Sequence, residues 1–123
     1  SADVWKFFVK MIGGVNSQNI SFFINNTTQY SYKQLNGSET NGASFLDIGS
    51  IDFESKRVVE ITVSDNISGY GVIGSVNNIG LAGNYPTEFL AEDASSVNSI
   101  QIEPGAEYSD NIDVTVRAYY LNV

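Results

Sequence analysis

Residues 4–12 read VWKFFVKMI and are followed by the pair Gly13-Gly14. Every odd position of this run is apolar, and such a two-residue period is typical of a strand with one face in a core. The side chains of that face are Trp5, Phe7, Val9 and Met11. Because consecutive glycines interrupt a strand, the run predicts a terminal β-strand that ends at Ile12.

The same alternation recurs along the chain, and no helical period is sustained. The further segments that the pattern predicts to be extended are 19–24, 30–32, 45–53, 56–64, 70–76, 97–102 and 111–121. One helical turn is expected within 89–96. In the last segment the alternation predicts a buried face made of Ile112, Val114, Val116, Ala118 and Tyr120.

Turn signals separate these segments. Asn36-Gly37 and Asn41-Gly42 are dipeptides that tolerate positive φ, Pro104-Gly105 is a further turn pair, and Gly49 predicts a bulge or bend. Eight or nine short strands spaced in this way predict an all-β fold, an antiparallel Greek-key β-sandwich, with a jelly roll as the alternative. At this length we expect residues 1–123 to form one domain.

The composition argues against several classes of function. Six basic residues face fourteen acidic ones, which gives a net charge of −8, and neither Cys nor His is present. We therefore expect no nucleic-acid partner, no membrane insertion and no cofactor. The usual nucleophile and base pairs are missing as well, so the chain is not expected to be an enzyme.

Uncharged polar residues dominate the hydrophilic part of the sequence, because Asn, Ser and Gly make up about a third of the chain. This composition is typical of secreted or virion surfaces, and it predicts an extracellular or cell-surface location, with a virion as the alternative. Five asparagines head an Asn-x-Ser/Thr sequence and are possible glycosylation sites or, alternatively, ordinary solvated side chains. They are Asn19, Asn25, Asn26, Asn36 and Asn66.

Two small groups of residues are weak candidates for ligand binding. Asp110 and Asp113 could offer oxygen ligands to Ca²⁺, although an ordinary turn before a strand uses the same residues. Tyr108, Tyr119 and Tyr120 could stack on a glycan if they were exposed, and packing in the core or at a corner is the alternative.

The terminal strand can pair in one of two chains. It can pair within its own domain, or residues 1–13 can act as a donor strand that completes the sheet of a neighbouring copy. In the second case Gly13 and Gly14 would be the hinge.

The stretch from Ile102 to Val116, IEPGAEYSDNIDVTV, resembles the closing hairpin of bacterial pilin domains of the spore-coat-U and archaic chaperone–usher group. Shared features are the Pro-Gly turn, a following Tyr, a short polar pair and an alternating Val/Thr strand. The resemblance implies an incomplete Ig-like domain that polymerises through an N-terminal donor strand. The family's usual disulfide has no counterpart in this Cys-free chain, which also continues through Tyr119 and Tyr120.

These observations favour a structural subunit of an extracellular homopolymeric assembly, such as a pilus-like filament, whose partners are copies of itself. Two alternatives stay open. One is a virion component, namely a jelly-roll capsid, decoration or tail protein, and the other is a carbohydrate-binding adhesive module with a glycan ligand.

Overall fold

The computed structural model describes residues 3–13, 18–34, 36–51, 55–65, 69–78, 86–104 and 112–122. Within these ranges the chain forms ten strands and no helix. The strands are β1 (Asp3–Ile12), β2 (Gln18–Ile24), β3 (Tyr30–Gln34), β4 (Glu39–Ala43), β5 (Leu46–Ile51), β6 (Lys56–Ser64), β7 (Val72–Asn78), β8 (Pro86–Ala91), β9 (Ile100–Pro104) and β10 (Asp113–Asn122).

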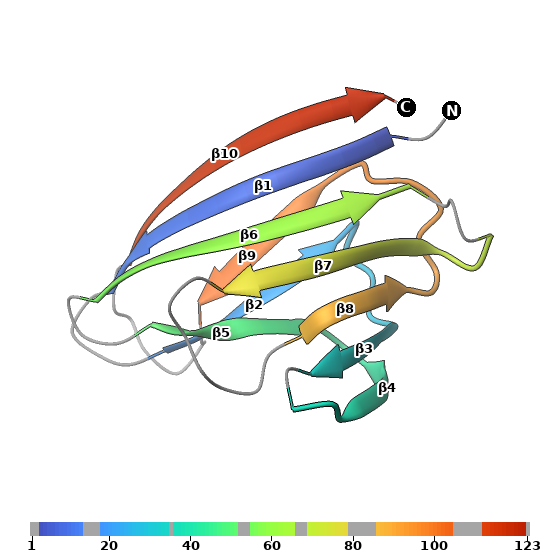
Figure 1. The fold of residues 1–123 in the computed structure, drawn as a ribbon, viewed down its shortest axis with the longest axis horizontal. Helices are drawn as coiled ribbons and strands as arrows, with labels where there is room; N and C mark the ends of the chain where they lie inside the picture. Colours follow the sequence, from blue (N-terminus) through green and yellow to red (C-terminus); the bar gives the residue numbers. More distant parts are fainter. Residues whose placement is uncertain are drawn as a thin grey trace.

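The strands build two antiparallel sheets, which confirms the predicted all-β sandwich (Figure 1). The larger sheet has seven strands in the order β10-β1-β6-β7-β8-β3-β4, and the smaller one has the order β5-β2-β9. β9 and β10 follow each other in the chain but belong to different sheets. The stretch that resembles a pilin hairpin therefore passes from one sheet to the other.

The core lies between the sheets and follows the predicted alternation. Val59, Ile61 and Val63 of β6 are buried, and so are the alternate apolar residues of β2. On β1 the side chains of Phe7 and Val9 are buried as well. In each case the apolar set lies on one face because successive side chains of a strand point to opposite sides.

Polar groups also connect the two sheets. The backbone N–H of Ile24 on β2 donates to the Tyr30 hydroxyl on β3 (2.9 Å), and burial of this hydroxyl raises the pKa of Tyr30. Elsewhere the buried Arg57 guanidinium donates to the amide oxygen of Asn78 (3.0 Å), whose own N–H donates to the carbonyl of Ile48 (2.6 Å). These bonds fix how the layers sit on one another, because an unmatched polar group in the core would be costly.

Two local predictions differ from the structure. Asn36-Gly37 forms the expected turn between β3 and β4, whereas Asn41-Gly42 lies within β4. There Gly42 has a φ of +71°, and the register between β4 and β3 shifts. The positive φ of Gly42 is therefore part of an irregular strand and not of a turn. The helical turn expected within 89–96 is also wrong, because residues up to Ala91 belong to β8 and a turn follows.

The largest correction concerns the last strand. β10 has the predicted alternation, but its expected inner face is not buried, since Val116 is 42% exposed and Tyr120 is 53% exposed. The smaller sheet ends at β9, whereas the larger sheet continues through β6 and β1 to β10. The even-numbered side chains of β10 therefore lack the second layer that the pattern suggested.

Candidate functional site

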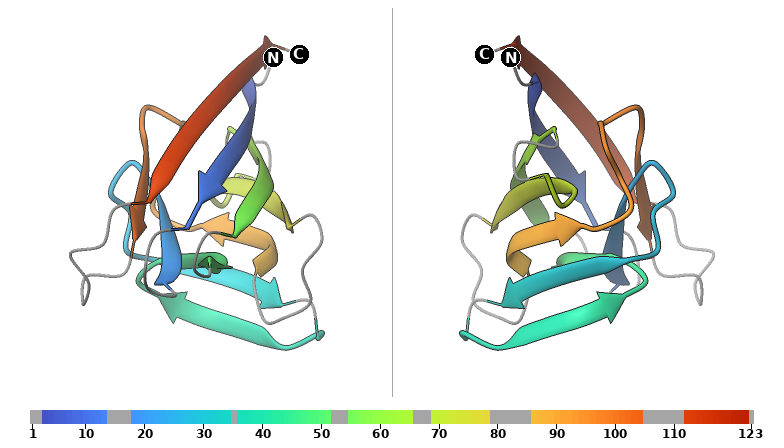
Figure 2. Two further views of the ribbon diagram at one scale, coloured as in Figure 1. Left: turned by 90° about the vertical axis from the view of Figure 1, so that its left-hand side faces the viewer. Right: turned by 90° about the vertical axis from the view of Figure 1, so that its right-hand side faces the viewer.

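β1 and β10 form a two-stranded antiparallel ribbon at one edge of the larger sheet, which we call the terminal ribbon (residues 3–12 and 113–122). Its register is continuous from Asp3 opposite Asn122 to Ile12 opposite Asp113. The chain ends lie together at one end of the ribbon (Figures 1 and 2). Within the described residues β10 has a single neighbour in the sheet, so it is joined to the sheet through β1 alone.

β1 completes both the sheet and the core. It pairs with β6 over residues 4–12 and with β10 on its other side. Phe7, Val9 and Met11 are buried in the core, and Trp5 packs against it while half-buried. Gly13, predicted as a hinge, is buried, and its N–H donates to the carbonyl of Ser55 (2.9 Å). Gly14 lies outside the described residues.

β10 presents apolar side chains on both faces. Val114, Val116 and Tyr120 lie on the inner face, and Tyr119 and Leu121 lie on the outer one, with Leu121 58% exposed. The aromatic rings are held by β1, since Tyr120 packs on Trp5 (centroids 4.7 Å apart) and Tyr119 meets the edge of Phe8 (5.8 Å). The ribbon is therefore ordered by its own contacts and still open to a partner.

The edges of the two sheets differ in how they are protected against pairing with another chain. β4 and β5 each have an irregular register and a glycine at positive φ, and β9 has five residues and ends at Pro104. These are common devices against edge-to-edge association. β10 has none of them over its ten residues, and its charged side chains are Asp113 and Arg117. Its outer edge is the one suited to strand addition.

A polar latch holds the end of the terminal ribbon. The carboxylate of Asp3 accepts hydrogen bonds from the Tyr120 hydroxyl (2.8 Å) and from the side-chain amide of Asn122, while the Asp3 carbonyl accepts one from the N–H of Asp65 (2.9 Å). The bond from Tyr120, followed by that from Asn122, lowers the pKa of Asp3 below its ordinary value. The same bond raises the pKa of Tyr120.

The latch predicts a pH dependence of the ribbon. Because the pKa of Asp3 is lower in the folded chain, its contribution is present above the ordinary Asp pKa and is lost as pH falls through the folded value. Tyr120→Phe removes the hydrogen bond that contributes most to the lowered pKa of Asp3. The pH at which the ribbon loosens on acidification should therefore rise. The fluorescence of Trp5, the single Trp and a neighbour of Tyr120, reports it. Tyr119→Phe is the control, and equal transitions in both variants would contradict the latch.

Of the other predicted site residues, Asn19, Asn26 and Asn36 are exposed. The Asn25 side chain is already used, because its oxygen accepts the N–H groups of Asn98 and Ser99 and its amide donates to the Ser96 carbonyl. Asn66 lies outside the described residues.

The ligand-binding candidates are not brought together. Asp113 is exposed at the start of β10, whereas Asp110 and Tyr108 lie outside the described residues. Within the described ranges no cluster of three potential metal ligands occurs. Tyr119 and Tyr120 point to opposite faces of β10, so these two rings do not form a single platform.

The latch residues Asp3 and Asn122 were missed in the sequence, where they lie 119 positions apart. A charge count could have drawn attention to the ribbon, since three of the six basic residues, Lys6, Lys10 and Arg117, fall in it.

Comparisons with protein-family models, with curated proteins and with solved structures found no match for this chain. None of the described segments is a helix of the length and apolar character needed to cross a membrane.

Proposed function

We propose that this protein is a structural subunit of an extracellular homopolymeric assembly, a pilus-like surface filament, whose copies join by β-strand complementation. The observation that carries the proposal is the position of β1. A terminal strand lies between β6 and β10 and supplies three buried side chains, so it completes both the core and the sheet.

A strand in this position can be exchanged between copies without loss of contacts. If β1 of one copy occupies the place between β6 and β10 of the next, the same pairs form as within one chain. β1 is the first of the ten described strands, so its exchange requires no other described strand to be rethreaded. Successive donation from copy to copy then gives an open chain of subunits.

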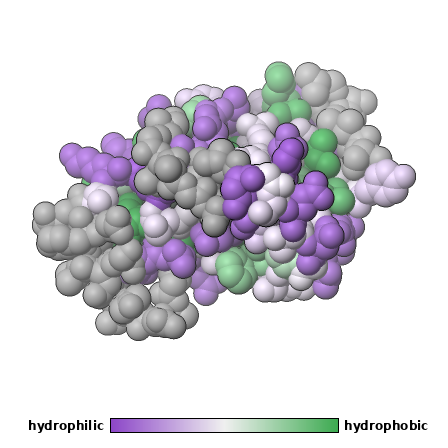
Figure 3. Space-filling model, turned by 60° about the horizontal axis from the view of Figure 1, so that its bottom comes forward, coloured by the Kyte–Doolittle hydropathy of each residue, from purple (hydrophilic) through white to green (hydrophobic). Residues whose placement is uncertain are grey.

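The composition supports an extracellular location for such an assembly. Uncharged polar residues form much of the chain, and the side that Figure 3 brings forward is mostly hydrophilic, with hydrophobic residues in small groups. The coloured residues on this side offer no large apolar patch for unspecific association.

Cysteine cross-linking tests the proposal, since the natural chain has no Cys. Lys10 and Val58 are exposed residues directly opposite each other on β1 and β6, at a separation that suits a disulfide. In the Lys10→Cys/Val58→Cys variant, oxidation of the concentrated protein should give a ladder of covalent multimers on a non-reducing denaturing gel.

The matched control is Thr62→Cys/Ser75→Cys, which places the two cysteines opposite each other on β6 and β7. Because these strands are not exchanged, the disulfide forms within one chain and the gel should show monomers. If the Lys10–Val58 pair gives only internally linked monomers at every concentration, β1 stays in its own chain and complementation is wrong.

A further inference from the structure

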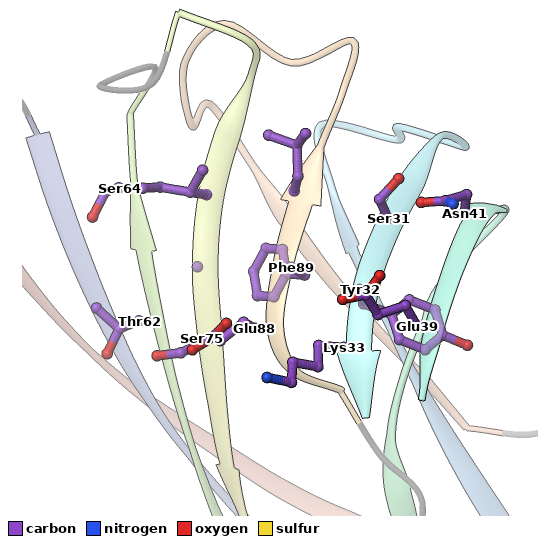
Figure 4. A pocket seen from close by; sticks show the side chains of 13 residues that line it. Ser31, Tyr32, Lys33, Glu39, Asn41, Thr62, Ser64, Ser75, Glu88 and Phe89 are labelled. Atoms are coloured by element: carbon purple, nitrogen blue, oxygen red, sulfur yellow. The ribbon is translucent and has the colours of Figure 1, made fainter. Parts of the chain in front are cut away.

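The outer face of the larger sheet, on the side away from the core, is hollowed into a trough with a volume of about 680 Å³. Two rows of side chains cross it (Figure 4). One row runs through Thr62, Ser75, Glu88, Lys33 and Glu39, and the other runs through Ser64, Ile73, Leu90 and Ser31. The trough is shallow and widely open to solvent, and it leaves room for side chains of a partner.

The trough combines an apolar centre with an acidic end. Ile73 and Leu90 are partly buried neighbours on β7 and β8. Glu88 and Glu39 are exposed on either side of Lys33, and no ion pair joins these three residues within the described part of the chain. Their net charge is −1, so this end favours a cationic partner.

Charge is divided unevenly between the terminal ribbon and the rest of the chain. The ribbon carries Lys6, Lys10 and Arg117 against Asp3 and Asp113, which gives it a net charge of +1. Since the whole chain has a net charge of −8, the residues outside the ribbon have a net charge of −9. Lys6 is bound to Glu60 (2.8 Å), whereas Lys10 and Arg117 form no ion pair with a described residue. Lys10 and Arg117 lie on the outer face of the ribbon, where Asp113 is the one acidic residue, so this face keeps a positive net charge. Placed on the acidic end of the trough of another copy, it brings opposite charges together.

We propose that the trough of one subunit receives the exposed β10 of a second copy of this chain. Arg117 then lies beside Glu88, while Tyr119 and Leu121, which share the outer face of β10 with Arg117, pack against Ile73 and Leu90. The inference rests on the proposed function and names the second contact by which subunits associate. A contact between two different surfaces of the same chain is a head-to-tail contact. Repeated head-to-tail contacts form an open filament unless the rotation from one copy to the next closes them into a ring.

Reciprocal charge reversal tests this contact in the full chain. Arg117→Glu and Glu88→Arg each put like charges at the contact, and each should raise the concentration needed for assembly about tenfold, as measured by sedimentation and light scattering. In an equimolar mixture, each contact between one copy of either variant and a copy of the other has opposite charges, so an alternating chain can form. Assembly of the mixture should return to within about threefold of the parent.

Glu103→Arg is the matched control for charge, because Glu103 is exposed on β9 in the other sheet, and it should assemble like the parent. Normal assembly of Glu88→Arg overturns the inference, whether the trough then binds a small ligand or nothing. If Arg117→Glu alone weakens assembly, β10 docks elsewhere and the inference is equally overturned. In both cases a covalent ladder from the Lys10–Val58 cysteine pair would leave complementation intact, whereas a parent chain that never multimerises overturns both proposals.

Discussion

Removal of residues 1–13 is expected to abolish folding, and a separate peptide with the sequence of residues 1–13 is expected to restore it. The truncation deletes the buried side chains of Phe7, Val9 and Met11. Loss of a buried Phe or Met side chain costs about 2–5 kcal/mol, so the three together approach the whole stability of about 5–15 kcal/mol that a domain has. It also leaves β10 without the one neighbour that it has among the described strands.

The peptide can act in trans because its alternating side chains and its backbone fit the place between β6 and β10. Trp5 is the only Trp of the chain and travels with the peptide, so its fluorescence reports insertion directly. Recovery of the fold would be followed by near-ultraviolet circular dichroism of the tyrosines in the truncated chain.

A peptide with Val9→Asp is the matched control. Val9 is fully buried, and an unpaired carboxylate at that position is too costly to bury, so this peptide should fail to restore the fold. A truncated chain that folds as a stable monomer without any peptide would contradict both this prediction and the proposed strand complementation.

Gly71→Ala is expected to be strongly destabilising. Gly71 has a φ of +147°, and a Cβ there would lie 2.3 Å from the carbonyl oxygen of Ala91. Since Ala91 is paired with Val72 at the end of β8, its backbone cannot withdraw without opening the β7–β8 pair. Strain and clash together should lower the free energy of unfolding by more than about 3 kcal/mol.

Gly69→Ala is the control, because Gly69 also has a positive φ (+78°) but no atom lies within 4 Å of the added carbon. Its cost should be about 1–2 kcal/mol, the strain of the left-handed conformation alone. Urea unfolding of both variants measures the difference. Equal losses would show that the approach of Ala91 is not what requires glycine at position 71.

Much of the strand content could be predicted from the sequence, because alternation is a property of the local backbone. β1, β2 and β6 have the predicted apolar faces in the core. The wrong predictions concern segments whose local sequence is compatible with two different structures. Asn41-Gly42 suits a turn or an irregular strand, and which of these forms depends on the pairing of β4 with β3.

The candidate site was predictable only in part. The apolar terminal strand and Gly13 were visible in the sequence, and they lie next to the exposed strand on which the proposals depend. Neither the latch from Asp3 to Tyr120 and Asn122 nor the trough could be foreseen, since each is assembled from strands that are distant in the chain.

The sequence by itself determined that this chain is a β-protein with one strongly apolar terminal strand, because side chains alternate across a strand wherever that strand is placed. Only the tertiary structure decided that β1 lies between β6 and β10 and that the smaller sheet ends at β9. An alternating pattern records that one face of a strand is apolar and not what covers it. For β10 no second layer covers that face, so the strand expected to complete the core lies exposed at the edge of the larger sheet.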